Sequence, residues 1–220
     1  MREEEHLNNL YNSYISYLLN KDRKNAESII LNAVKDGINI KDIYLKVFQR
    51  SQYYIGELWQ NGTISVAQEH YCTAITQTVM SYLYQYIFQT AKIGKNFLSF
   101  CITEELHDLG LKMITDLIEM TGFDTFYLGA NVPIKQIEEA INEYKADVVG
   151  ISITMATQIN ALVNLIQTIR SIKTATKIKI IVGGYCLNRS ETLWKKTGAD
   201  EFARDGDEAA KKTLELVSKD

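Results

Sequence analysis

The feature that most constrains the fold is a change in the spacing of apolar residues near Gly94. Before this point apolar residues recur at the spacing of helices, as in Leu7, Leu10 and Tyr14. After it, short β-rich runs alternate with longer helical stretches. The sequence therefore predicts a helical part followed by an α/β part.

The first part, residues 1–92, is predicted to form a four-helix bundle. Turn-forming Gly, Asn and Asp residues mark its breaks, at 20–22, 37–39 and 61–63. Ser65 stands three residues before Gln68, a capping-box pattern, so we expect the fourth helix to begin there and to run to about Lys92.

The second part, residues 95–220, is predicted to be a doubly wound parallel sheet of five strands. Four strands are indicated by apolar runs, at 97–102, 125–128, 148–154 and 178–182. Alternation with helices and right-handed crossovers favour a flavodoxin-like, Rossmann-like α/β topology. In such sheets ligands bind beyond the carboxyl ends of the strands, so the loops there should converge on one crevice.

Composition excludes several functions. The chain has 220 residues, 46% of them hydrophobic, and can bury a core. Its net charge is -3 and its basic residues are scattered, which argues against binding to nucleic acid. The acidic, polar start and the lack of long apolar runs indicate neither a secretion signal nor a membrane anchor, so we expect a cytoplasmic protein.

Neither a disulfide framework nor a common nucleotide site is indicated. The three cysteines, Cys72, Cys101 and Cys186, are far apart and odd in number, and we interpret them as small core residues. Gly183 and Gly184 follow a predicted strand but match neither the dinucleotide fingerprint nor a phosphate-binding loop. They are either turn residues or places where a bulky group approaches the backbone.

His107 is the first candidate site residue. It lies in the loop after the first predicted strand, in the pattern Glu-x-His-x-x-Gly from Glu105 to Gly110. An imidazole can bind a metal through one nitrogen when a carboxylate fixes the other, and Glu105 or Asp108 could do so. The alternative is a solvated or capping histidine.

Trp59, Glu69 and His70 form the second candidate site. If the third and fourth helices are antiparallel, the tryptophan near the end of one faces the Glu-His pair at the start of the other. The alternative is that Trp59 anchors the core while Glu69 and His70 belong to a solvated face.

From about residue 97 to residue 217 the chain resembles the cobalamin-binding domain family. Glu105 to Gly110 is similar to its motif D-x-H-x-x-G, with Glu for Asp. In that family the His replaces the cofactor's dimethylbenzimidazole as lower ligand of cobalt. Residues 127–133, 152–154 and 183–184 match the loops that line the slot for the displaced nucleotide tail. The resemblance implies that His107 binds cobalt and that the cofactor is also bound by Glu105, Leu106, Asp108, Leu109, Gly110, Ser152, Thr154, Gly183 and Gly184.

The helical part is similar to the cap found beside such domains. Two families share this cap: corrinoid methyl carriers and light-responsive adenosylcobalamin-dependent regulators. The spacing of Trp59 from Glu69 and His70 looks like the W-x9-EH motif of the light-responsive group, in which these residues cover the adenosyl group. The resemblance therefore implies adenosylcobalamin as cofactor, with methylcobalamin or hydroxocobalamin as alternatives.

The resemblance leads us to expect a cobalamin-binding sensor, responsive to light, that is not itself an enzyme. Gln60 stands where some light-responsive relatives carry a histidine, so two-histidine ligation of cobalt through this position is not expected. The DNA-binding domain of the transcriptional relatives is not seen, so the signal should pass through self-association or a separate signalling protein. The alternatives are a corrinoid methyl carrier of a methyltransferase system and a binder of another tetrapyrrole.

Overall fold

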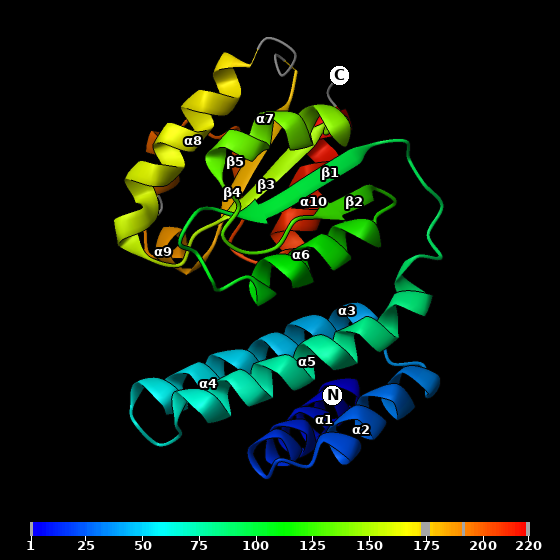
Figure 1. Cartoon of the computed structure of the whole chain (residues 1–220). Helices are drawn as coiled ribbons and strands as arrows, with labels where there is room; N and C mark the ends of the chain where they lie inside the picture. Colours follow the sequence, from blue (N-terminus) through cyan, green and yellow to red (C-terminus); the bar gives the residue numbers. More distant parts are fainter. Residues whose placement is uncertain (1, 173–176, 191, 219–220) are drawn as a thin grey trace. The chain divides into compact units, whose positions relative to one another are not determined.

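The computed structural model describes residues 2–172, 177–190 and 192–218. The chain divides into two compact units, Met1–Tyr86 and Ile87–Asp220, which Figure 1 shows as a helical unit and an α/β unit. Among the described helices, none combines the length and apolar character needed to cross a membrane.

The helical unit contains the predicted helices and breaks. Its elements are α1 (Arg2–Leu19), α2 (Arg23–Lys35), α3 (Ile40–Asp42), a π-helix (Ile43–Phe48), α4 (Gln49–Gln60) and α5 (Val66–Ile87). Ser65 does cap α5, because its Oγ accepts a hydrogen bond from the Gln68 N–H at 3.2 Å. The Gln68 side chain instead donates to the Leu19 carbonyl at 3.1 Å, so the reciprocal half of the predicted capping box does not form.

The π-helix packs into the centre of the helical unit. It continues α3 and leads directly into α4, and it buries Ile43, Tyr44, Val47 and Phe48. The Phe48 ring lies 5.4 Å from Tyr14 of α1 and 5.5 Å from Tyr44, in tilted geometries favourable for aromatic pairs. These contacts hold α1 against the middle of the α3–α4 helix.

The predicted end of the fourth helix is wrong, because α5 ends at Ile87 rather than near Lys92. Beyond it the chain bonds to the α/β unit instead of continuing the helix. The Lys92 amine donates to the Phe123 carbonyl at 2.8 Å, and the Ile93 N–H donates to the Gly122 carbonyl at 2.9 Å. Sequence periodicity does not register such tertiary bonds.

The α/β unit is a five-stranded, fully parallel sheet in the order β2-β1-β3-β4-β5, which confirms the predicted fold class. The strands are β1 (Asn96–Cys101), β2 (Asp124–Tyr127), β3 (Val148–Ser152), β4 (Lys179–Gly183) and β5 (Glu201–Phe202). The helices between and after them are α6 (Leu109–Glu119), α7 (Ile134–Glu143), α8 (Ile159–Ser171), α9 (Tyr185–Asn188) and α10 (Gly206–Ser218).

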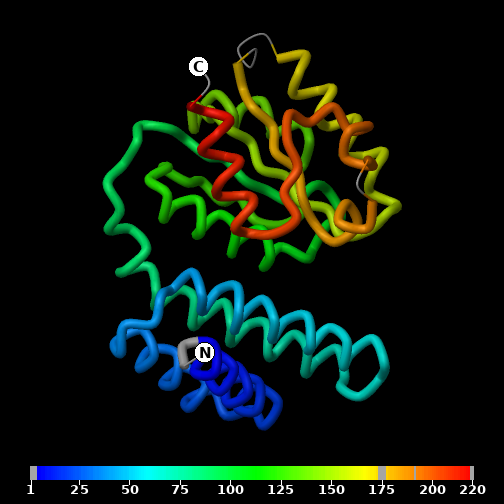
Figure 2. Tube along the Cα trace, turned by 180° about the vertical axis from the view of Figure 1, so that it is seen from behind, coloured from blue at the N-terminus to red at the C-terminus, as the bar shows by residue number. Residues whose placement is uncertain are grey.

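Each face of the sheet has its own apolar core. Helices α6 and α10 cover one face, where Phe97, Ile118 and Ala209 are buried together. Helices α7 and α8 cover the other face, seen on the far side of the sheet from α6 and α10 in Figures 1 and 2. This layering leaves the carboxyl ends of the strands to the loops.

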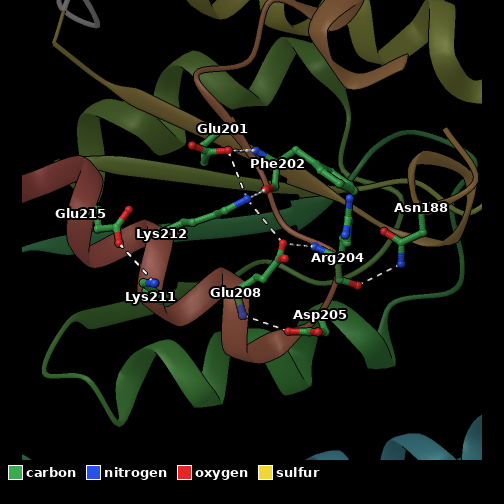
Figure 3. Close-up of polar contacts among 9 residues, drawn as sticks. All are labelled: Asn188, Glu201, Phe202, Arg204, Asp205, Glu208, Lys211, Lys212 and Glu215. Carbon is green, nitrogen blue, oxygen red and sulfur yellow. Dashed lines mark hydrogen bonds and ion pairs between the residues drawn. The ribbon is translucent and has the colours of Figure 1, made fainter. Parts of the chain in front are cut away.

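The loop after β5 is fixed by a cluster of polar bonds (Figure 3). Asp205 caps α10 by accepting from the Glu208 N–H at 2.9 Å, and the Glu208 carboxylate accepts from the Arg204 N–H at 3.1 Å. The Asn188 amide of α9 donates to the Arg204 carbonyl at 2.9 Å. The loops after β4 and β5 are thereby joined into one wall at the carboxyl edge of the sheet.

Candidate functional site

The loops after β1 and β2 are joined at the carboxyl edge of the sheet. The Cys101 N–H donates to the Gly129 carbonyl at 2.9 Å, and the Val132 N–H donates to the Cys101 carbonyl at 3.1 Å. The Asn131 N–H reaches the Glu105 carbonyl at 3.1 Å. The loop that carries the Glu-x-His motif is therefore held in place by its neighbour.

Glu105 and His107 form a pair in this loop. Glu105 Oε1 accepts from the His107 backbone N–H at 2.8 Å and lies 2.7 Å from the imidazole Nδ1. The carboxylate is 1% exposed, whereas the His107 side chain is 62% exposed. A buried anion thus orients a ring that projects toward solvent.

The same carboxylate fastens the loop after β3. Glu105 Oε2 accepts from the Thr154 N–H at 2.7 Å. Burial alone would raise the pKa of Glu105, but the hydrogen bonds from the His107 ring, the His107 N–H and the Thr154 N–H hold it at about 2. Glu105 is therefore ionised at neutral pH, and its charge favours a proton on Nδ1 of His107.

This arrangement suits a metal ligand. With Nδ1 facing the carboxylate, the lone pair of a neutral imidazole lies on Nε2, the nitrogen that would bind a metal. Among the described residues, no three His, Cys, Asp or Glu side chains gather as a metal cluster. His107 therefore stands as a single candidate ligand.

Of the two carboxylates considered as partners of His107, Asp108 bonds elsewhere. Its Oδ2 accepts from the Tyr127 hydroxyl at 2.7 Å, so Glu105 rather than Asp108 fixes the His107 ring. Of the other predicted cofactor residues in this loop, Leu109 is buried, Leu106 is 72% exposed and Gly110 is exposed at the start of α6.

Ser152, Gly183 and Gly184 lie at the ends of β3 and β4. Ser152 and Gly183 line a narrow cavity of about 20 Å³ between the sheet and α6 and α10, whose other walls are mainly apolar. At Gly184, φ is 110° and an added Cβ would lie 2.1 Å from the Ile153 carbonyl oxygen. Glycine there lets the loops after β3 and β4 touch.

The structure brings Glu69 and His70 together in the helical unit. Glu69 Oε2 lies 2.5 Å from His70 Nδ1; the Glu69 side chain is 23% exposed and that of His70 75%. Helices α4 and α5 run antiparallel, and Gln52 of α4 bonds to Thr76 of α5. Trp59 follows Gln52 by seven residues and Glu69 precedes Thr76 by seven, so the two lie at about the same level of the helix pair. The Trp59 side chain is 42% exposed. Trp59 is thus not a core anchor.

Sequence reasoning missed several residues at the carboxyl edge. The Gln158 Oε1 accepts from the N–H groups of Thr154 at 3.3 Å and Met155 at 3.0 Å, and so supports the loop after β3. Met155 and Tyr185 are apolar side chains with exposed fractions of 54% and 60%. Their place in the loops that follow β3 and β4 is the sequence feature that could have identified them as candidate site residues.

A larger hollow, of about 310 Å³, lies on the helical unit and is lined by Tyr11, Gln49, Arg50, Tyr53, Tyr54 and Glu57. The Arg50 guanidinium is already stacked 3.8 Å from the centre of the Tyr11 ring and donates to Asn8 at 2.7 Å. These contacts give it a structural role, and we assign it no ligand.

Comparison with known proteins decides the family. A model described as a B12 binding domain matches residues 96–214, and a second model of the same description matches residues 10–84. The chain belongs to the B12-binding domain family. Cobalamin is accordingly the cofactor of this protein.

The B12-binding protein has relatives among methanogen corrinoid proteins. It is 30% identical over 114 residues to a dimethylamine corrinoid protein of Methanosarcina barkeri, over 52% of this chain and 53% of that protein, just over half of its length. It is 24% identical over 199 residues to trimethylamine corrinoid protein 1 of Methanosarcina mazei, over 87% of this chain and 89% of that one. The fold is that of the monomethylamine corrinoid protein of Methanosarcina barkeri, with a TM-score of 0.83, 20% identity and coverage of 95% and 99%.

The residues present in this B12-binding protein fit a corrinoid. The donor set supplies an exposed imidazole whose Nδ1 faces a buried carboxylate, as a cobalt ligand requires. The cavity behind Ser152 has mainly apolar walls, but its volume of about 20 Å³ has no room for a heterocycle in this structure.

Replacing Glu105 with glutamine is expected to lower the free energy of unfolding of the apoprotein by about 2 kcal/mol at neutral pH, because charge-assisted bonds to His107 and Thr154 are lost. The folded-state pKa of about 2 lies below the ordinary 4.5, so the stabilisation is present above pH 4.5 and fades toward pH 2. Urea unfolding should show a smaller difference in the free energy of unfolding between the wild type and Glu105→Gln at pH 3 than at pH 7.

Glu119→Gln is the matched control. Glu119 is also buried, and its carboxylate accepts from the Thr125 N–H at 3.0 Å, but at the opposite end of the sheet. This variant should lose stability while leaving the protonated nitrogen of His107 unchanged in NMR spectra. An equal change at His107 in both variants would contradict the role given to Glu105.

Proposed function

We propose that this protein is a corrinoid methyl carrier, which holds a methyl group on cobalt between two methyltransferase reactions. The observation that carries the proposal is the Glu105–His107 pair, in a chain whose named relatives are corrinoid proteins of methylamine systems. The corrinoid would supply a cobalt centre that accepts and donates the methyl group. The protein itself would act as a carrier rather than a catalyst.

In this proposal the residues of the α/β unit have separate tasks. His107 would hold the cobalt through Nε2, while Glu105 keeps the proton on Nδ1 and holds the loop to Thr154. Leu106, Met155 and Tyr185 present exposed apolar surface on which a corrin ring could rest. Ser152, Thr154, Gly183 and Gly184 serve the nucleotide tail, with Leu109, Asp108 and Gly110 shaping the loop that carries His107.

The helical part would cover the upper face of the cofactor. We propose residues 1–92 as a cap and residues 95–220 as the cofactor-binding domain, with Trp59, Glu69 and His70 facing the upper ligand. Trp59 would supply an aromatic wall and the Glu-His pair polar contacts.

The second candidate is the light-responsive adenosylcobalamin sensor, acting through self-association or a separate partner. One observation favours it: Trp59 is exposed near the level of a Glu69–His70 pair that other side chains hold in place. A methyl group cannot form hydrogen bonds with this pair, whereas the ribose hydroxyls of an adenosyl group can.

A single series of measurements separates the two functions. A carrier should bind methylcobalamin and hydroxocobalamin at least as tightly as adenosylcobalamin, and illumination of the adenosyl form should leave its elution volume unchanged. Binding is followed by absorption in the dark, and elution by gel filtration before and after illumination. A preference for adenosylcobalamin of about tenfold or more, together with a shift in elution on illumination, would overturn the carrier proposal in favour of the sensor.

A further inference from the structure

In the helical unit a chain of polar side chains leads inward from the exposed His70. The His70 Nδ1 is paired with Glu69 Oε2 at 2.5 Å. The other oxygen of that carboxylate, Oε1, lies 2.9 Å from the Thr73 hydroxyl, which lies 2.8 Å from the Gln52 Oε1. Both oxygens of Glu69 are therefore engaged.

The inner end of this chain is buried. The Gln52 Nε2 donates to the Thr76 hydroxyl at 2.8 Å, and that hydroxyl lies 3.0 Å from the hydroxyl of Tyr14. Tyr14 and Thr76 are both 0% exposed. Burial raises the pKa of the Tyr14 phenol, so it remains a neutral hydrogen-bonding group over the physiological range.

Gln52 is the element that crosses between helices. Helices α4 and α5 run side by side in both views of Figures 1 and 2, and the amide of Gln52 bonds to Thr73 and Thr76, which are three residues apart on α5. The Thr73 hydroxyl has one hydrogen, which it donates to one of its two neighbouring oxygens at a time. The position of the Glu69 carboxylate is thus tied to α4 rather than set by solvent.

We propose that Gln52 and Thr73 are positioning residues that hold the Glu69–His70 pair for contact with the upper ligand of the corrinoid. This inference rests on the proposed placement of that pair over the upper ligand. The pair can exchange hydrogen bonds with a water or hydroxide ligand, or with the ribose hydroxyls of an adenosyl group, but not with a methyl group. Gln52 and Thr73 therefore add to the affinity for hydroxocobalamin and adenosylcobalamin but not to the affinity for methylcobalamin.

The test is Thr73→Val, which keeps the shape of the side chain and removes the hydroxyl. Dissociation constants of the full-length variant for hydroxocobalamin, adenosylcobalamin and methylcobalamin are measured in the dark by absorption. The affinities for the first two are expected to fall about tenfold relative to methylcobalamin, the effect of one hydrogen bond to a charged group. Gln52→Met, which removes both amide bonds, should do the same.

Two controls come from the same helix. Thr73→Ser keeps the hydroxyl and should keep the wild-type ratio of affinities, as should Thr78→Val, which removes a hydroxyl that bonds to the Ala74 carbonyl of its own helix at 2.9 Å. An equal loss for all three cobalamins, or no loss for any, would overturn the proposal. The comparison requires cobalamin binding but no methyl transfer, so failure of the carrier function would leave it decisive.

A second readout needs no cofactor. Long-range proton–nitrogen NMR spectra of His70 in the apoprotein should show the form protonated on Nδ1 in the wild type and in Thr73→Ser, and a mixture of forms in Thr73→Val. Identical His70 spectra in all three proteins would show that Glu69 does not depend on Thr73, which also overturns the proposal.

Discussion

Replacing His107 with alanine is expected to lower the affinity for hydroxocobalamin by on the order of 100-fold, because the bond from the protein to cobalt is lost. The apoprotein should also lose about 1 kcal/mol of stability, because the buried Glu105 carboxylate loses its hydrogen bond with the His107 ring. Absorption titration gives the affinity, and urea unfolding gives the stability.

The nitrogen on cobalt can be identified directly. In the reduced, paramagnetic Co(II) form, labelling the histidines with nitrogen-15 should change the hyperfine splitting from a triplet to a doublet in the wild type. The His107→Ala protein should show no such change, whereas His6→Ala, which removes another exposed histidine, should behave as the wild type. If the hyperfine splitting of the wild type were the same with and without the label, ligation by His107 would be contradicted.

Replacing Gly184 with alanine is expected to destabilise the α/β unit by about 4 kcal/mol, a sum of backbone strain and overpacking. The residue has φ of 110°, and an added Cβ would lie 2.1 Å from the Ile153 oxygen and 2.9 Å from its carbonyl carbon and nitrogen. The backbone atoms of Ile153 cannot rotate away from the new Cβ, as the end of a flexible side chain could. Urea unfolding of the apoprotein measures the loss.

Gly129→Ala is the control that measures the cost of backbone strain without a steric contact. Gly129 also has a positive φ, of 83°, but an added Cβ there would meet no described atom within 4 Å. This variant should cost about 1 kcal/mol. Equal losses in the two variants would show that the close approach of the loops after β3 and β4 does not matter.

The sequence predicts the fold well where apolar runs are long. Strands β1 to β4 lie within two residues of their predicted bounds, because β1, β3 and β4 are runs of mainly buried residues and β2 is a short half-buried run. Strand β5 was not located, since Glu201 and Phe202 alone make no pattern. The π-helix was also missed: Ile43, Tyr44, Val47 and Phe48 have the spacing of an ordinary amphipathic helix.

The site is predictable only where its partners are neighbours in sequence. Glu105 and His107 are two residues apart, and their motif named them together. The bond from Tyr127 to Asp108 spans 19 residues, so nothing in the loop itself indicated it. Likewise, Gln52 precedes Trp59 by seven positions on α4 and looks unremarkable until α5 is laid beside it.

The π-helix also fixes the angular phase of everything that follows it. It inserts an extra residue into its turn, and an α-helix advances about 100° for each residue. If Ile43–Phe48 kept its length but wound as regular α-helix, Gln52 and Trp59 would turn around the axis by about 100°, and deleting one residue of the segment would cancel that turn. The orientation of α4 toward α5 is therefore encoded upstream of Gln52, in the π-helix.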